Sequence, residues 1–318
     1  YIESLREYLI AKSVIGQSRA SECVAQNIDS DNTLFDMLPH SANITSYDSI
    51  PVPKRLLITN QFMNRETTAL YVWKSNDIIS KSIEDKKYLR SLNKSGIGRL
   101  LLSFTSDQIE IISKDSADIL GFIEQCANYN IQVDLLLGEP TWIYPKNRNK
   151  LLTILKKLQG IPFKGIHLDL EPDQLFQSQS VNKQKTLLNL ISTIKAVIDE
   201  SVVPITLISH PRYSNEIDGV CVFCALETIK LYQITLMIYQ NNYQNVAAIA
   251  NRILTKYPNL KFSIAQSIES DIAPDNSYKH LNIQQFSTEM AKLKSKLLQQ
   301  NFNGIVIQSW SEYKEQQQ

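Results

Sequence analysis

Two carboxylates separated by a single residue, Asp169 and Glu171, are the side chains of this sequence best suited to acid–base chemistry. Between positions 165 and 171 apolar residues alternate with polar ones, so in a β-strand the two carboxylates would share one face. Pro172 follows and ends the strand, because proline has no N–H to donate. Two like charges this close raise the pKa of one of them, which helps to keep an acidic proton near neutral pH. The spacing predicts a carboxylate pair at the carboxyl end of a strand.

The elements that would position this pair recur along the chain as short β-rich segments separated by amphipathic stretches. The expected strands are 55–62, 98–105, 131–138, 165–171, 202–209, 233–240, 260–267 and 304–310. The expected helices include 117–128, 150–158, 185–198, 246–257 and 286–300. This alternation predicts an α/β protein with a (β/α)8 TIM barrel. A doubly wound open sheet is the rival, but neither glycine-rich phosphate motif occurs in a chain with only 9 glycines.

The N-terminal part has a different character. Residues 1 to about 30 show helical spacing of apolar residues, whereas 29–53 are rich in Asn, Asp, Ser and Pro. We therefore expect an N-terminal helical extension and linker at 1–50 and the barrel domain at 51–318. Further domains outside this sequence are compatible with that division.

The composition narrows the range of partners. The 318 residues are 43% hydrophobic and 20% charged, as in a globular protein with a large core. A formal net charge of +1 gives no strong attraction to nucleic acid, and no run of about 18 apolar residues predicts a membrane span. Cys221 and Cys224 have the spacing of redox or metal-binding cysteines, but their neighbours are apolar. We expect both to be small buried hydrophobic residues.

In a TIM barrel the active site is built from the carboxyl ends of the strands. The predicted strand ends carry carboxylates, amides and aromatic rings, which are the side chains of a carbohydrate site. The candidates are Asn60, Glu139, Trp142, Asp169, Glu171, His210, Tyr239, Gln240, Glu269 and Trp310. The expected partner is a carbohydrate substrate, with no cofactor and no metal. Such a role would favour a protein exported to the periplasm or outside the cell.

The segment 164–171 resembles the strand-four signature D-G-x-D-x-D-x-E of the chitinase-like glycoside hydrolases of family 18. Three further positions fit this resemblance: Ser103 on strand two, Met237-Ile-Tyr239 on strand six, where the family carries M-x-Y, and Trp310 on strand eight. The resemblance therefore spans strands two to eight but depends on few residues.

The resemblance implies a role for each matching residue. Glu171 would be the general acid, and Asp169 would orient a 2-acetamido group. Tyr239 would bond the carbonyl of that group, and Trp310 would stack beneath the sugar ring. Lys164 and His167 stand where the family has its first two aspartates, and Gln240 follows Tyr239 where Asp is usual. The partner of Asp169 is therefore changed.

A second resemblance implies a different catalytic partner for Glu171. Glu171-Pro172 is similar to the N-E-P of the large retaining-glycosidase clan, whose nucleophilic Glu ends strand seven, where this chain has Glu269. Carboxylates about 5 Å apart would imply a covalent retaining mechanism. Glu171 is the acid in both interpretations.

Two other classes of function stay open. A barrel that has lost turnover would act as a carbohydrate-binding module. A metal-dependent hydrolase fits poorly, because such barrels need converging histidines and the chain has only 4. Each candidate also has a structural interpretation: the carboxylates can cap a helix or form ion pairs, and the aromatic rings can fill the upper barrel.

Overall fold

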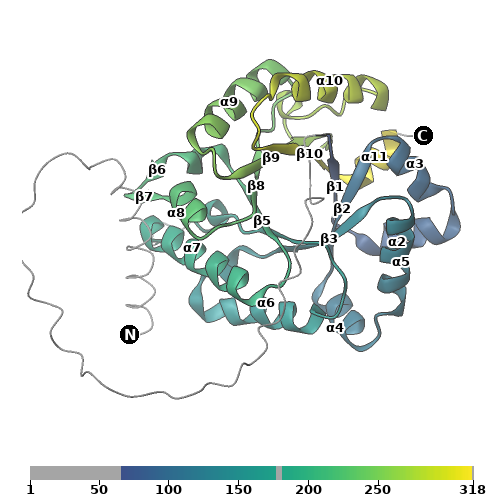
Figure 1. The fold of residues 1–318 in the computed structure, drawn as a ribbon, viewed down its shortest axis with the longest axis horizontal. Helices are drawn as coiled ribbons and strands as arrows, with labels where there is room; N and C mark the ends of the chain where they lie inside the picture. The colour runs from purple at the N-terminus through teal and green to yellow at the C-terminus, as the bar shows by residue number, and fades with distance from the viewer. Residues whose placement is uncertain (1–65, 177–180, 317–318) are drawn as a thin grey trace, which may run out of the picture.

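The structure, a computed structural model, describes residues 66–176 and 181–316. Eight parallel strands form a closed barrel in the order β1-β10-β9-β8-β5-β4-β3-β2, with helices around it (Figure 1). The strands are β1 (Thr68–Val72), β2 (Ile97–Ser103), β3 (Gln132–Gly138), β4 (Ile166–Asp169), β5 (Ile205–Ser209), β8 (Gln233–Met237), β9 (Lys261–Ser267) and β10 (Phe302–Gln308). The predicted (β/α)8 fold is confirmed.

Amphipathic helices cover the outside of the barrel. They are α2 (Ser75–Glu84), α3 (Tyr88–Lys94), α4 (Ser106–Lys114), α5 (Ala117–Asn128), α6 (Pro145–Leu158), α7 (Lys183–Glu200), α8 (Val222–Thr228), α9 (Tyr243–Lys256), α10 (Ile283–Lys296) and α11 (Trp310–Gln316). Short 3-10 helices follow several strands, namely η1 (Pro140–Ile143), η2 (Pro172–Leu175), η3 (Pro211–Ser214) and η4 (Pro274–Asn276). A small hairpin joins β6 (Glu216–Ile217) to β7 (Val220–Cys221). None of the described helices is long and apolar enough to cross a membrane.

The alternation of side chains explains where the core lies. Outward residues of the strands, such as Leu100 and Leu168, pack against the helices in one large apolar cluster. Inward residues form a second, smaller cluster in the upper barrel: Ala69, Tyr71, Leu101, Leu136, Ile208, Ala265 and Val306. Alternate residues of each strand therefore belong to different layers, as the alternation in the sequence predicts.

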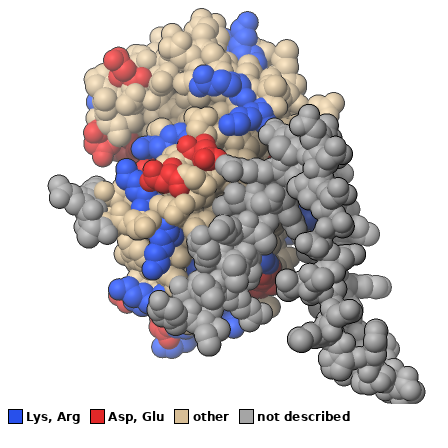
Figure 2. Space-filling view, turned by 90° about the vertical axis from the view of Figure 1, so that its left-hand side faces the viewer, with Lys and Arg blue, Asp and Glu red and all other residues tan. Residues whose placement is uncertain are grey.

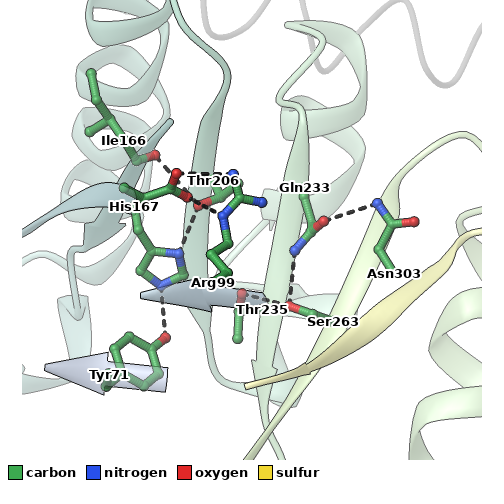
Figure 3. A network of polar contacts seen from close by, with 10 residues as sticks. Tyr71, Arg99, Ile166, His167, Thr206, Gln233, Thr235, Ser263 and Asn303 are labelled. Atoms are coloured by element: carbon green, nitrogen blue, oxygen red, sulfur yellow. Dashed lines mark hydrogen bonds and ion pairs between the residues drawn. The ribbon is translucent and has the colours of Figure 1, made fainter. Parts of the chain in front are cut away.

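Polar side chains fill the lower barrel and satisfy one another (Figure 3). Arg99 on β2 is ion-paired with Asp134 on β3, with N–O distances of 2.9 and 2.8 Å. Gln233 donates to Ser263 at 3.0 Å and accepts from Asn303 at 3.0 Å. These contacts tie neighbouring and distant strands together beneath the rim.

Seven predicted strands overlap the observed ones, but the first prediction is wrong. The first barrel strand is β1 (Thr68–Val72), and 55–62 lies outside the described residues. The expected boundary near residue 50 and the expected N-terminal helix also lie outside them.

The cysteine prediction is also wrong. Cys221 and Cys224 form a disulfide, with their Cα atoms 5.4 Å apart. Cys221 ends β7 and is the N-cap residue of α8, so the first helical turn brings Cys224 back beside it. Both cysteines are also only partly buried, so their apolar neighbours indicated neither full burial nor the disulfide.

Lys and Arg side chains lie next to Asp and Glu side chains on the molecular face shown in Figure 2. Exposed ion pairs of the described residues include Lys195 with Asp199 at 2.7 Å and Lys156 with Glu200 at 3.4 Å. Such exposed pairs contribute little stability, on the order of 0–1 kcal/mol each. This face carries both signs of charge.

Candidate active site at the carboxyl ends of the strands

The carboxylate pair lies at the end of β4. Leu168 and Leu170 are buried in the outer apolar layer, so Asp169 and Glu171 are directed to the interior and rim of the barrel. Glu171 precedes η2, and its Oε1 accepts a hydrogen bond from Gln174 Nε2 at 2.8 Å. Asp169 Oδ1 is buried and has no hydrogen-bond partner among the described residues. One oxygen of the pair is therefore available to a ligand.

Electrostatic coupling within this pair is strong. Burial and, next, the charge of Glu171 raise the pKa of Asp169 from 3.8 to about 7. The sequence predicted that one carboxyl of the pair would have a raised pKa, and that carboxyl is Asp169. The pair therefore keeps a proton at neutral pH.

Gly138 makes room for Asp169. The two residues are register partners on β3 and β4. A Cβ atom added to Gly138 would lie 3.0 Å from the Cβ and 3.3 Å from the carbonyl oxygen of Asp169. Any larger residue at 138 would therefore push the carboxylate out of place.

Tyr239 and Glu269 join this pair at the rim. Burial raises the pKa of Tyr239, and so do the charges of Glu269, Asp169 and Glu171, in that order. Tyr239 therefore lies within the field of all three carboxylates.

The last residues of β9 and β10, Ser267 and Gln308, hold Glu269. Gln308 Nε2 donates to its Oε1 at 3.3 Å, and Ser267 Oγ donates to its Oε2 at 3.3 Å. Burial raises the pKa of Glu269, whereas these hydrogen bonds lower it. The structure thus brings together four of the predicted site residues, Asp169, Glu171, Tyr239 and Glu269.

His167 lies one layer below the pair, where family 18 has an aspartate. It is 2% exposed, its Nε2 is 2.7 Å from Tyr71 Oη, and its Nδ1 is 2.7 Å from Thr206 Oγ1 (Figure 3). Burial and then the charge of Arg99 lower the pKa of His167 to about 3. The imidazole is therefore neutral and bridges three strands.

Trp310 does not lie at the rim. It begins α11, is 3% exposed, and donates a hydrogen bond from Nε1 to Tyr88 Oη at 2.7 Å. Tyr88 belongs to α3, outside the barrel. The prediction that Trp310 forms the floor of a sugar site is therefore wrong.

Two other candidates cap short helices. Glu139 Oε1 accepts from the backbone N–H of Thr141 at 3.0 Å, at the start of η1. His210 Nδ1 accepts from the backbone N–H of Arg212 at 3.1 Å, at the start of η3. Both side chains are half-buried, and these hydrogen bonds give each a structural role at its turn.

The remaining candidates are less well defined. Trp142 lies in η1 and packs, partly buried, against the outer apolar layer. Gln240 follows Tyr239 and is half-buried. Asn60 lies outside the described residues. Among the residues that the structure describes, neither Trp142 nor Gln240 forms a hydrogen bond with the carboxylates.

An aromatic pair at the end of β1 is not among the site residues predicted from the sequence. Tyr71 and Trp73 stack with ring centroids 5.6 Å apart and an angle of 4° between the ring planes. Trp73 is 38% exposed, next to the rim. The alternation of Ala69, Tyr71 and Trp73 is the pattern of a strand with one apolar face, but the predicted first strand lies further upstream, at 55–62.

In the part of the chain that the structure describes, no group of three or more His, Cys, Asp or Glu side chains could hold a metal ion. Neither a protein-family profile nor a curated protein matches the sequence. Solved structures of similar fold exist.

A GH18 chitinase from Pseudoalteromonas aurantia has a TM-score of 0.50 and 15% identity, over 77% of this chain and 94% of that one. The spore cortex-lytic enzyme SleL from Bacillus megaterium has a TM-score of 0.49 and 12% identity, over 78% and 71%. A D-psicose 3-epimerase has a TM-score of 0.46 and 11% identity, over 76% and 83%. Likeness at this level shows the barrel fold alone.

Proposed function

We propose that this barrel is a glycoside hydrolase that cleaves a polysaccharide or an amino-sugar glycan, with Glu171 as the general acid. The observation that carries the proposal is the coupled pair of Asp169 and Glu171 at the rim, which keeps a proton to about pH 7. The charges of Glu269, Asp169 and Glu171 all act on Tyr239, so a third carboxylate and a phenol lie near the pair.

In the proposed reaction, Glu171 gives its proton to the glycosidic oxygen as the bond to the anomeric carbon breaks. Two groups can stabilise the positive charge that develops on that carbon. In an amino sugar, the 2-acetamido oxygen attacks the anomeric carbon while Asp169 and Tyr239 orient the group. Otherwise Glu269 forms a covalent bond to that carbon. In either route water then attacks the anomeric carbon, breaks the new bond and releases the sugar.

The two routes differ in what the substrate must carry. The first route needs the 2-acetamido group, and its relay is altered because His167 is neutral and engaged with Tyr71 and Thr206. The chitinase of similar fold makes amino-sugar oligosaccharides the first substrates to try. Cleavage of a glucoside lacking the acetamido group would favour Glu269 as the nucleophile.

The alternative is a barrel that binds carbohydrate without turnover. To separate the two, a panel of aryl glycosides and amino-sugar oligosaccharides is incubated with the protein, and binding is measured by calorimetry. Glu171→Gln, purified in the same way, controls for glycosidases from the expression host. Turnover by the wild type alone supports the hydrolase, and binding without turnover supports the binding module. If the protein neither binds nor cleaves any member of the panel, both interpretations are wrong.

Gly138→Ala is expected to lower kcat/KM about tenfold. The added Cβ would lie 3.0 Å from that of Asp169, and shifts of a few tenths of an ångström in a reacting group are costly. Gly160→Ala is the matched control, because a Cβ there meets nothing within 4 Å. Thermal unfolding of both variants is measured alongside. Equal activities of the two variants would show that the position of Asp169 does not matter.

A further inference from the structure

Trp73 stands at the mouth of the barrel, directly after β1. Ala69 and Tyr71 belong to the interior cluster of the upper barrel, and the alternation of the strand places Trp73 on the same side, one step nearer the rim. Its exposed fraction of 38% is the highest of any aromatic side chain in the described part of the chain. A large apolar ring is thus presented where the strands end.

A hydrogen bond fixes the height of Trp73 relative to the carboxylates. Tyr71 Oη lies 2.7 Å from His167 Nε2, which joins β1 to β4 across the barrel (Figure 3). Both strands run parallel, and two residues further along each of them stand Trp73 and Asp169. The indole and the carboxylate therefore belong to the same layer, with Glu171 one step above.

The orientation of the indole is also held. Its ring plane is within 4° of that of Tyr71, with the centroids 5.6 Å apart, so one face is directed to Tyr71. Tyr71 is itself fully buried and hydrogen-bonded, which makes it a rigid support. A ring braced on one side and exposed at the other is suited to stacking against a flat ligand.

We infer that Trp73 is the platform on which the sugar ring next to the carboxylate pair stacks, in place of the buried Trp310. The inference rests on the proposed function. The ligand it selects is a pyranose with C–H bonds along one face, which lies against the indole while its polar groups reach the rim. Asp169 Oδ1, buried and without a hydrogen-bond partner among the described residues, is an acceptor in the same layer for a hydroxyl or amide of that sugar.

The test measures binding and turnover separately. In the Glu171→Gln background, calorimetry with amino-sugar oligosaccharides is expected to show at least tenfold weaker binding for Trp73→Ala, and binding within about threefold of the parent for Trp73→Phe. In the wild-type background, Trp73→Ala is expected to raise KM by a similar factor with a smaller effect on kcat. The control is Tyr232→Ala. It also removes an aromatic ring, but Tyr232 directly precedes β8 and so lies at the opposite end of the barrel.

The outcomes are distinct. Trp73→Ala that is folded by circular dichroism and binds as tightly as the parent overturns the role of Trp73 and leaves the hydrolase intact. A loss in Trp73→Phe as large as in Trp73→Ala also overturns the stacking role. If the parent binds and cleaves no sugar, the proposed function itself fails, and the role of Trp73 fails with it.

Discussion

Replacing Glu171 by Gln is expected to lower kcat/KM by about 10²–10⁴-fold, the usual contribution of a general acid. The amide keeps the shape of the side chain and can still accept from Gln174, which donates to Glu171 Oε1 at 2.8 Å. It has no acidic proton for the leaving oxygen. The loss should be smaller for substrates with good leaving groups, such as nitrophenyl glycosides, because these need less protonation.

The pH profile provides an independent check. Because the pKa of Asp169 is about 7, the carboxylate pair loses its last proton as the pH passes neutrality. In the wild type kcat/KM should fall above about pH 7, and in the residual activity of Glu171→Gln this limb should move to lower pH, because the charge of Glu171 no longer raises the pKa of Asp169. Glu124→Gln, an exposed change on α5, is the control. Full activity of Glu171→Gln on every substrate would exclude the proposed acid.

Replacing Asp169 by Asn is expected to raise the free energy of unfolding by about 2–3 kcal/mol at pH 8–9 and to leave it nearly unchanged at pH 4. Folding raises the pKa of Asp169 from 3.8 to about 7, so between these values the folded protein holds a proton that the unfolded chain has released. The wild type therefore loses stability as the pH rises from about 4 to 7, and then no more from this group. Asn stays neutral and avoids the loss.

Urea unfolding at several pH values measures this difference, with the exposed Asp275→Asn as the control. The same variant should lose activity, because Asp169 lies beside Glu171 and orients the substrate in the proposed mechanism. A variant that is more stable and less active would show that the buried carboxylate is kept for function. An Asp169→Asn protein whose stability relative to the wild type does not change with pH would contradict the raised pKa.

The fold could be predicted because its strands carry local signals. The alternation at 165–171 and the apolar runs of the other strands survive in the structure, and α5 begins and ends where its apolar spacing indicated. The expected first strand lies upstream of the observed one because 55–62 is the longer β-prone segment, whereas the observed strand, Thr68–Val72, has only five residues. Which of two β-prone segments closes a barrel depends on pairing with the last strand, and local sequence does not carry that information.

The position of a candidate site residue could be predicted only where it follows directly from the end of a strand. Asp169 ends a strand, and Glu171, Tyr239 and Glu269 each lie two residues after one, so all four lie near the rim. Trp310 also follows a strand, but the chain turns at once into α11, and the indole finds Tyr88 on a helix far away in sequence. Such a contact cannot be inferred from spacing.

Pairing of the first and last strands closes the barrel, since Thr68 is the register partner of Ile305. As the chain leaves the ribosome, one edge of β1 therefore stays without this neighbour until β10 has been made. An open edge of this kind can pair with other chains. Gln308, which donates to Glu269, arrives on that same last strand. A nascent chain thus acquires its closed barrel and a contact that holds Glu269 in one late step, and until then it is both prone to aggregation and without that contact.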